Sequence, residues 1–187
     1  VRLVRPASKK KPTTVLEHPP GQEMQMDWSP YTVRLGGVEV LVYCFSLVLA
    51  FSRYLFCRFV LDETVETVIS LHEAAFADIG AVPLKLTYDN MTTVGRHVGP
   101  GKIWLNPRFE SWAAPYKFTI VILPPGKPNL HGCVERPFHY IEHNFLAGRE
   151  FADLDDLNQK AAWWCAERAN ARVHGTLRER PVDRLVR

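Results

Sequence analysis

The chain has 187 residues, of which 47% are hydrophobic and 23% are charged, and its formal net charge is +3. These values are close to the average for a globular domain and exclude a disordered, collagen-like or fibrous chain. The length suits one domain of ordinary size with a hydrophobic core of its own.

Positive charge is concentrated at the two ends of the sequence. Residues 1–12 carry five lysines and arginines and no acid, and six arginines lie between Arg168 and Arg187. Basic ends around a mildly acidic body indicate either a polyanion partner, whose phosphates would meet these ends, or solubilising tails. Charge alone does not separate the two interpretations.

The first predicted strand follows a linker. Residues 1–20 are rich in Lys, Pro and Thr, which predicts a basic linker or arm. From Gln22 to Trp28 polar and apolar residues alternate, which is typical of a strand. Asp27 would then share a face with Gln25 and Glu23, turned away from the core.

Two more strands are predicted over residues 38–50 and 54–61, after a turn at Gly36-Gly37. Three strands joined by short turns predict an antiparallel meander. The apolar run from Val40 to Phe51 is shorter than the roughly 20 residues that a membrane-spanning helix needs, so no membrane segment is expected. No apolar block follows the basic opening residues, and we expect no secretory signal.

The rest of the chain alternates helices and strands. A helix is predicted over 63–79, capped by Asp62 or Thr64 and ended by Gly80. The later elements are a strand at 84–88, a glycine-rich loop, a short helix near 106–115, a strand at 118–123, a helix between 129 and 146 and a last helix over about 153–170. This order predicts a mixed α/β sheet with helices on its faces.

Three acidic residues fall where such a sheet would bring them together. Asp27 is on the first strand, Asp89 is at the carboxyl end of the fourth, and Glu135 is on the helix after the fifth. Clustered carboxylates repel one another unless cations or protons hold them. A few oxygen ligands suit Mg²⁺ or Mn²⁺, and two such ions about 4 Å apart can activate an attacking oxygen and stabilise a leaving one.

The residues around these acids carry a family resemblance. The segments 25–28, 88–90 and 128–136 resemble the three acidic motifs of the D,D,E transposases and retroviral-type integrases. Asn170-x-Arg172-x-His174-Gly175-Thr176 resembles the sequence that follows this core in bacterial insertion-sequence transposases. Residues 145–149 and 155–158 resemble the IstA type more narrowly. The similarity runs from about Gly21 to Leu185.

This resemblance implies a fold and a division of the chain. The implied fold is ribonuclease H-like α/β: a mixed five-stranded sheet, with an antiparallel meander plus parallel strands, flanked by helices. Residues 1–20 would be the basic arm and residues 21–150 the catalytic core. Residues 151–187 would form a C-terminal helix and basic tail, packed on the core or leading to a further domain.

The resemblance also implies an activity and partners. Water would cleave the phosphodiester at the 3′ end of a mobile element, and the freed 3′-hydroxyl would attack target DNA. Asp27 would touch both of two divalent cations, Mg²⁺ or Mn²⁺, while Asp89 and Glu135 would each hold one. DNA, further copies of the chain assembled on DNA and an AAA+ ATPase helper are the implied partners, in a bacterial cytoplasm.

Candidate phosphate contacts lie near Glu135 and in the tail: Lys127, Asn129, Arg136, Arg172 and His174. The interval between Asp89 and Glu135 is longer than is usual in retroviral integrases, and the glycine-rich loop would absorb the extra length. Pro137 predicts a kink or a helix start just beyond Glu135.

Other interpretations stay open at this point. A nuclease of the same fold would use the same acids without strand transfer, and a non-catalytic DNA-binding or assembly module would not use them. Glu135, His139 and His143 have a spacing that can bind Zn²⁺. Trp163 and Trp164 are expected in the core. The four cysteines lack paired spacing, which favours reduced, buried thiols in a cytosolic protein.

Overall fold

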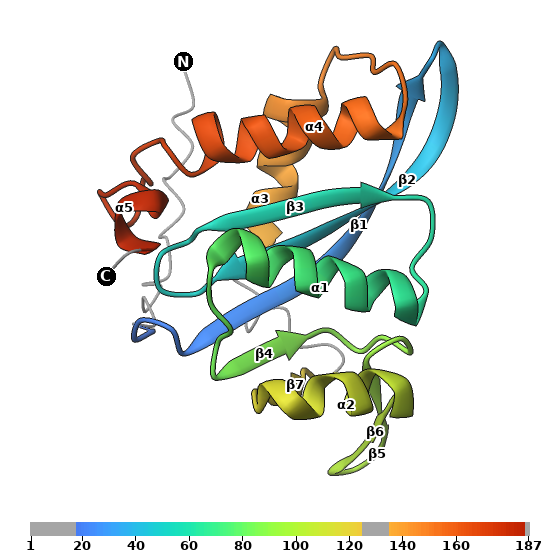
Figure 1. The fold of residues 1–187 in the computed structure, drawn as a ribbon, viewed down its shortest axis with the longest axis vertical. Helices are drawn as coiled ribbons and strands as arrows, with labels where there is room; N and C mark the ends of the chain where they lie inside the picture. The colour runs from blue at the N-terminus through green and yellow to red at the C-terminus, as the bar shows by residue number, and fades with distance from the viewer. Residues whose placement is uncertain (1–17, 125–134, 186–187) are drawn as a thin grey trace, which may run out of the picture.

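A mixed five-stranded sheet forms the centre of the molecule, with its strands in the order β3-β2-β1-β4-β7. The structure is a computed structural model that describes residues 18–124 and 135–185. The strands of this sheet are β1 (Glu23–Leu35), β2 (Val38–Leu49), β3 (Leu55–Val60), β4 (Lys85–Tyr88) and β7 (Thr119–Ile122). Strands β1, β2 and β3 are antiparallel, whereas β1, β4 and β7 are parallel (Figure 1). The predicted meander with added parallel strands is confirmed.

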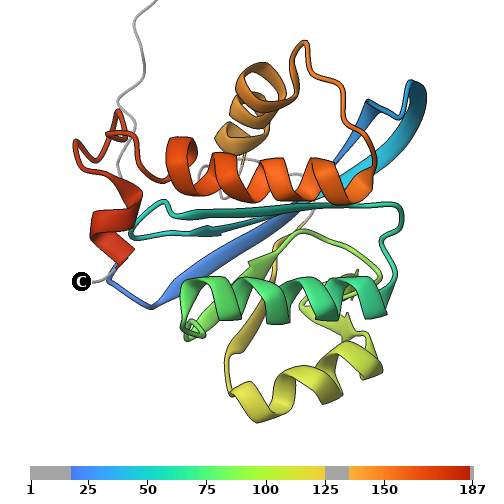
Figure 2. The same cartoon turned by 45° about the horizontal axis from the view of Figure 1, so that its top comes forward.

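Helices cover both faces of this sheet. Helices α1 (Val65–Ile79) and α2 (Pro107–Ala113) lie on one face, and α3 (Glu135–Tyr140) and α4 (Leu154–Trp164) lie on the other (Figure 2). A 3₁₀ turn (Ala114–Tyr116) follows α2, and π-helical stretches continue α3 (Ile141–Leu146) and α4 (Cys165–Ala169). A short α5 (Pro181–Leu185) closes the described chain.

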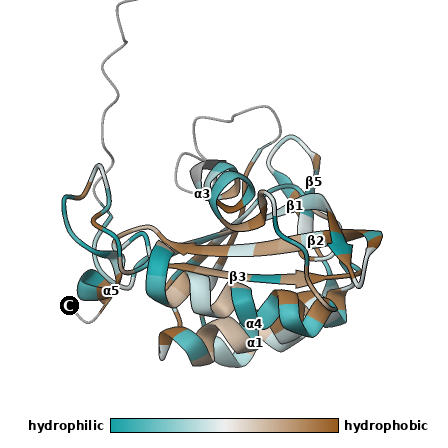
Figure 3. Cartoon of the chain, turned by 90° about the horizontal axis from the view of Figure 1, so that it is seen from above, coloured by the Kyte–Doolittle hydropathy of each residue, from teal (hydrophilic) through white to brown (hydrophobic). Residues whose placement is uncertain are grey.

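The hydropathy of these elements follows their place in the layers. Strands β2 and β3 are mainly hydrophobic, whereas α1 and α4 mix hydrophobic and hydrophilic residues (Figure 3). A sheet between two helical layers is buried on both faces, but a covering helix buries only the side that meets the sheet. The core therefore lies in two parts, one on each face of the sheet.

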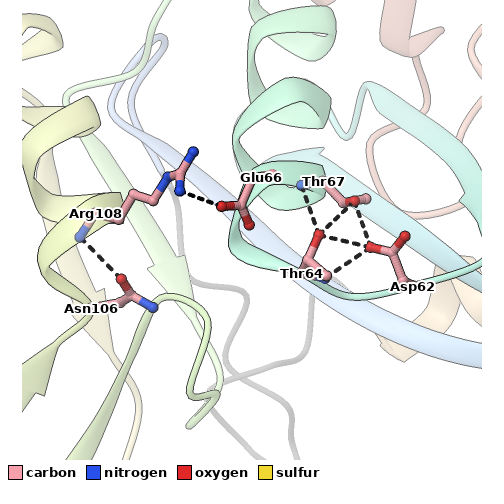
Figure 4. Close-up of polar contacts among 6 residues, drawn as sticks. All are labelled: Asp62, Thr64, Glu66, Thr67, Asn106 and Arg108. Atoms are coloured by element: carbon pink, nitrogen blue, oxygen red, sulfur yellow. Dashed lines mark hydrogen bonds and ion pairs between the residues drawn. The ribbon is translucent and has the colours of Figure 1, made fainter.

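The predicted helix over 63–79 is confirmed as α1, and its cap is Thr64. The Thr64 side chain accepts a hydrogen bond from the Thr67 backbone N–H, and Gly80 ends the helix with φ 73°. Asp62 supports the cap, since its Oδ1 accepts from the Thr64 hydroxyl at 2.8 Å and from the Thr67 hydroxyl at 2.6 Å (Figure 4). Both candidate residues therefore contribute to the cap: Thr64 bonds the helix backbone, and Asp62 bonds the hydroxyls of Thr64 and Thr67.

Helix α2 is joined to α1 by an ion pair. The Asn106 side chain caps α2 by accepting from the Arg108 N–H at 3.1 Å. The Arg108 guanidinium in turn pairs with the Glu66 carboxylate in the first turn of α1 (Figure 4). Because both groups are exposed, this pair contributes about 0–1 kcal/mol and mainly orients α2.

Strand β1 is buried on both faces, and each face contributes to a different core. Met24 and Met26 pack with α1 and α2, whereas Val33, on the other face, packs with the α3 and α4 layer. The expectation that Glu23 and Gln25 face away from the core is therefore wrong in one respect. Both side chains are buried, at 7% and 4% exposure, because helices cover the second face as well.

The segment expected to be a glycine-rich loop contains a hairpin. Strands β5 (Gly95–Gly99) and β6 (Lys102–Leu105) pair antiparallel as a separate two-stranded sheet. Gly101, with φ 67°, belongs to the turn between them. The hairpin projects from the body beside α2 (Figure 1).

The free edge of β3 is covered by two asparagine side chains. Asn170 accepts from the Leu55 N–H at 2.8 Å and donates to the Leu55 carbonyl at 2.9 Å. Asn158 makes the same pair of bonds with Phe59, both at 2.8 Å. These amides replace the backbone of a missing neighbour strand and leave less of the edge open to pairing.

The π-helical stretch Cys165–Ala169 explains how both amides reach one strand. At about 100° per residue, an unbroken α-helix would place Asn170 roughly 120° around the helix from Asn158. The π turn, closed by the Asn170 N–H on the Cys165 carbonyl, absorbs one residue and reduces this angle to about 20°. The two side chains then lie on the helix face that meets β3.

Several smaller expectations concern single residues. Trp164 is buried, as predicted, whereas Trp163 is 53% exposed, so its assignment to the core is wrong. The described cysteines are buried and unpaired; Cys133 lies outside the described residues. Glu135 already belongs to α3, so the helix does not start beyond it as one alternative predicted, and α3 contains Pro137. No helix within residues 18–124 and 135–185 is long and apolar enough to cross a bilayer.

Candidate active site

Asp27 and Asp89 occupy matching positions on neighbouring parallel strands. The β1–β4 ladder pairs Glu23 with Lys85 and ends with Met26 opposite Tyr88. Asp27 and Asp89 are the next residue on each strand, so their backbones lie side by side at the carboxyl end of β4. Asp27 is half-buried and Asp89 is exposed. Two of the three predicted acids thus lie on neighbouring strands, beside each other at the carboxyl end of β4.

Asp27 is held by its own strand. Its Oδ1 accepts a hydrogen bond from the Trp28 backbone N–H at 2.8 Å. The Trp28 ring packs edge-on against Phe45, with ring centroids 5.3 Å apart. Because Asp27 also pairs across the sheet with Ser46 of β2, its carboxylate stands on a rigid central strand rather than on a loop.

A buried hydrogen bond fixes the strand end that carries Asp89. The Nδ1 atom of His72 lies 2.7 Å from the Val68 carbonyl, which can only accept, so the proton is on Nδ1. The Nε2 atom then accepts from the Tyr88 hydroxyl at 3.0 Å. Burial lowers the pKa of His72 to about 4, so the ring is neutral at pH 7. This contact ties the residue before Asp89 to α1.

Beneath the two aspartates lies a buried polar cluster that links β1 to β4. The Glu23 carboxylate accepts from Gln25 at 3.2 Å and from Thr87 at 2.9 Å, and it lies 2.6 Å from the Lys85 ammonium. Burial raises the pKa of Glu23, but the hydrogen bonds from Lys85, Thr87 and Gln25 outweigh that effect and lower it. The carboxylate therefore stays charged and cross-links the two strands.

Gln25 and Ser46 were not predicted as site residues, although both flank Asp27. Ser46 is fully buried, and neither its Oγ nor the Oε1 of Gln25 has a hydrogen-bond partner among the described residues. Buried polar atoms without a partner are uncommon, and two of those in the described residues lie on the sheet face of Asp27. The polar positions of β1 were the only sequence signal, and they could not reveal the Ser46 contribution from β2.

The remaining predicted site residues are placed only in part. Glu135 is the first residue of α3, and its side chain, like that of Arg136, is not among those that the structure describes. Lys127 and Asn129 fall outside the described residues. Among the side chains that are described, no three His, Cys, Asp or Glu gather closely enough to hold a metal ion. The position of the Glu135 carboxylate stays a prediction.

The two tail candidates have structural contacts. The Arg172 guanidinium lies 3.7 Å from the centre of the Tyr140 ring, which packs the tail against α3. The Nδ1 atom of His174 lies 3.3 Å from the Thr176 N–H and 3.4 Å from the Leu177 N–H, and it accepts from both. Each therefore has a packing role, and contact with DNA remains a prediction for both.

The histidines of the zinc alternative are also placed. The rings of His139 and His143 are stacked, with centroids 4.0 Å apart and planes 14° apart. The Nδ1 atom of His143 lies 2.9 Å from the His139 carbonyl, so that nitrogen already has a partner. Stacked rings do not aim their nitrogens at one point, and the zinc interpretation gains no support.

Comparison with known proteins identifies relatives of the chain. The family model named integrase core domain matches residues 17–128, a span that includes Asp27 and Asp89. A protein named as a transposase of insertion sequence element IS5376, from Geobacillus stearothermophilus, is 31% identical over 181 residues, covering 96% of this chain and 45% of the relative. An IS21-like insertion sequence transposase from Bacteroides fragilis is 34% identical over 172 residues, covering 89% and 32%. The chain thus spans less than half the length of these relatives.

A solved structure agrees with the fold. The integrase catalytic core domain of HTLV-2, in complex with magnesium, superposes with a TM-score of 0.64 at 18% identity, covering 89% of this chain and 97% of that one. Together with the strand order and the parallel β1–β4 and β4–β7 pairs, this likeness confirms the predicted ribonuclease H-like fold.

Proposed function

Because this chain belongs to the integrase core domain family, we propose that it is the catalytic core of a DNA transposase, using Asp27, Asp89 and Glu135. Polynucleotidyl transfer is the activity that the family indicates. The observation that carries the finer assignment is the register of β1 and β4, which sets Asp27 beside Asp89 at one strand end. Glu135 completes the set from the start of α3, on the layer that covers the same face of the sheet.

Divalent cations fit this donor set. Two carboxylates from adjacent strands, one half-buried and one exposed, offer hard oxygen ligands beside solvent and leave room for water and phosphate. When bound, Mg²⁺ or Mn²⁺ would neutralise the carboxylates and supply Lewis acidity toward a phosphodiester. Asp27 would hold both cations, and Asp89 and Glu135 would hold one each.

The chain's own residues would keep this site rigid through the reaction. The Trp28 N–H orients the Asp27 carboxylate, and the Tyr88 hydroxyl bond to His72 holds the strand end before Asp89. The Glu23 cluster keeps β1 and β4 in register below them. Preorganised groups of this kind need little rearrangement as charge develops on the phosphate.

The proposed substrate is duplex DNA, cleaved at the 3′ ends of a mobile element and then joined to a target by the freed 3′-hydroxyl. Lys127, Asn129 and Arg136 are the proposed phosphate contacts nearest Glu135, with Arg172 and His174 further along the chain. The proposal includes oligomers assembled on DNA, an AAA+ ATPase helper and a bacterial, DNA-associated cytoplasmic location. The IstA-type motifs support the helper.

A strand-transfer assay tests this function and separates it from a nuclease of the same fold. The chain is incubated with Mg²⁺ or Mn²⁺, a target plasmid and a duplex whose 3′ end is already cut. Joined product supports a transposase, whereas hydrolysis of the plasmid without joining supports the nuclease. Calorimetric titration with Mn²⁺ is the companion measurement, because a non-catalytic module with an inactive core would bind no Mn²⁺ at Asp27 and Asp89.

A further inference from the structure

We propose that the β5–β6 hairpin is a DNA-binding element that lies against the duplex entering the candidate active site. Arg96 and Lys102 would contact phosphates, and Trp104 would contact a base or sugar face. This inference rests on the proposed function and extends it, since it names a surface for DNA that none of the acidic motifs includes.

The hairpin is fastened to the residue that follows Asp89. The side chain of Asn90 accepts a hydrogen bond from the His97 backbone N–H at 2.7 Å. The His97 ring reaches the other way, with Nε2 donating to the Ile122 carbonyl at the end of β7, 3.0 Å away. Met91 and Gly95 exchange two backbone hydrogen bonds, of 3.0 and 2.8 Å. The hairpin therefore has a fixed position relative to Asp89.

The base of the hairpin is tightly packed. A Cβ atom on Gly95 would lie 2.7 Å from a Leu105 methyl group and 2.9 Å from the Trp104 carbonyl oxygen, and 3.2 Å from a methyl group of Ile122. Only glycine fits a backbone approach this close. Because the base is anchored and close-packed, side chains further out on the hairpin are carried by a rigid support.

One face of the hairpin presents an arginine and a tryptophan together. Arg96 and Trp104 are directly opposite each other on the two strands, and the guanidinium lies 5.8 Å from the centre of the indole ring. Lys102 is two residues before Trp104 on β6 and so points to the same face. Trp104 is 39% exposed, and Val98 and Ile103 are 54% and 48% exposed. Ile103 alternates with Trp104 and so lies on the other face, which leaves Arg96, Lys102 and Trp104 as the candidate binding face of this projection.

The charge around these groups favours DNA over a protein partner. Between Asp89 and Glu110 the sequence contains two arginines and one lysine and no acid. Arg108 is engaged with Glu66, but no ion pair within residues 18–124 and 135–185 joins Arg96 or Lys102 to an acid. A positive surface beside an acidic site suits a polyanion, and the indole of Trp104 can pack against the sugars of a duplex while Arg96 and Lys102 meet its phosphates.

Helix α4 offers a matched control. Arg168 lies 5.8 Å from the centre of the exposed Trp163 ring, the same separation as in the hairpin pair. Helix α4 and the hairpin lie at opposite ends of the molecule in Figure 1. The W163A variant removes an exposed tryptophan that has a neighbouring arginine but lies on α4, and it therefore separates a local effect of Trp104 from a general loss of aromatic surface.

The test is the binding of a fluorescein-labelled 30-base-pair duplex to the chain, followed by anisotropy at several salt concentrations. R96Q/K102Q should lower the log–log salt slope by about 0.9 for each phosphate that the variant no longer neutralises. W104A should weaken binding about 10-fold, and W104F should restore most of the affinity, since a phenyl ring still offers an apolar face to the sugars. W163A should bind as the unaltered chain does. Circular dichroism and thermal melts establish that every variant is folded.

The inference would be overturned by hairpin variants that bind DNA like the unaltered chain, or by a control that loses as much affinity as they do. A hairpin variant that alters the sedimentation of the protein alone, but not DNA binding, would assign the surface to a second copy instead. Absence of DNA binding by the unaltered chain at low salt would also overturn it. Strand transfer is scored separately, so hairpin-dependent binding without strand transfer would leave the hairpin inference standing and reject the proposed function.

Discussion

Two parts of the central sheet, the free edge of β3 and the carboxyl end of the interior strand β4, treat their polar groups differently. At the β3 edge, the amides of Asn158 and Asn170 bond the Phe59 and Leu55 backbone groups, and α4 packs over them. At the carboxyl end of β4, the ladder simply stops, and Asp89 is exposed beside a half-buried Asp27. One region has its polar groups satisfied from within the chain, whereas the other leaves carboxylates at the surface.

This difference indicates a division of labour between stability and chemistry. Buried backbone groups must be paired, so the β3 edge contributes to folding through contacts that involve no ligand. Carboxylates held close together repel, so the proposed site would give up some folding free energy to keep ligands for cations. Substitutions in the two regions should therefore separate: one set changes stability, and the other changes activity.

The largest effect is expected from the acids. Asp27→Asn, Asp89→Asn and Glu135→Gln each keep the side chain's size but remove a charge that would hold a divalent cation. Strand transfer should fall by at least about 10³-fold for each, and pairs of substitutions should cost little more than one, because the ligands act as a unit. Denaturant unfolding should show unchanged or slightly higher stability, since repulsion is relieved.

The control for the acids is the stacked pair His139 and His143. Replacing either with alanine should leave most of the strand-transfer activity, because neutral imidazoles are poor ligands for Mg²⁺. Histidine variants that abolish activity, together with a dispensable Asp27, would contradict the assignment and favour zinc.

The next largest effect is expected on stability, at the β3 edge that Asn158 and Asn170 cover. Asn170→Ala leaves the Leu55 N–H and C=O buried without partners, which should lower the free energy of unfolding by about 1–3 kcal/mol. Asn158→Ala should cost somewhat less, because its site is only partly buried. Gln159→Ala, at an exposed neighbour, is the matched control and should change stability by less than about 0.5 kcal/mol. Urea unfolding measures all three, and strand transfer per folded molecule should stay constant.

Much of the fold could be predicted from the sequence because its signals are local. Alternation marked β1, the stripe and caps marked α1, and turn residues separated the elements. The covered β3 edge could not be found in this way. Asn158 and Asn170 fell within motifs noted for resemblance, but their function depends on a π-helical phase shift that no periodicity reveals.

Part of the candidate site could also be predicted from local signals in the sequence, and part could not. Asp27 and Asp89 could be proposed from the sequence because each lies in a motif of the family resemblance and on or after a predicted strand, whereas the register that sets them side by side comes from the structure. The burial of Glu23 and Gln25 could not, since alternation says which residues share a face but not that helices cover both faces. The β5–β6 hairpin was not predicted, because its glycines indicate a loop whether or not the backbone forms paired strands.

A third prediction concerns pH and the residue behind Asp89. Histidine has an ordinary pKa of 6.5, which applies to the unfolded chain, and burial lowers the pKa of His72 to about 4 in the folded state. The unfolded chain therefore binds an extra proton between these values. The stability that follows is fully present above about pH 6.5 and decreases as the pH falls toward 4, by about 3 kcal/mol in all.

His72→Gln removes this titration, so its unfolding free energy should vary less between pH 4 and 6.5 than that of the unaltered chain. Urea unfolding across this range is the measurement. Equal slopes for the His72 variant and the unaltered chain would show that the buried ring is not what makes the fold acid-sensitive.

The smallest effect on stability and activity should come from Ser46. This residue lies on β2, between the β3 edge and the strand that carries Asp27. Its hydroxyl is fully buried opposite Asp27 and has no hydrogen-bond partner among the described residues. An unpaired buried hydroxyl is costly, so Ser46→Ala should raise the free energy of unfolding by up to about 1 kcal/mol. If the hydroxyl supports the Asp27 carboxylate through water or substrate, strand transfer should fall, but by less than about 10-fold.

Ser46→Cys sharpens this test, because it keeps a weak donor of nearly the same shape. Ser46→Cys should be more active than Ser46→Ala, but it should not show the higher stability expected of the alanine variant. A Ser46→Ala protein that is both less stable and fully active would contradict the idea that this strand gives up folding free energy to serve Asp27. In that case β2 would contribute to stability alone, as the β3 edge does, and the strands that serve the proposed site would be β1 and β4.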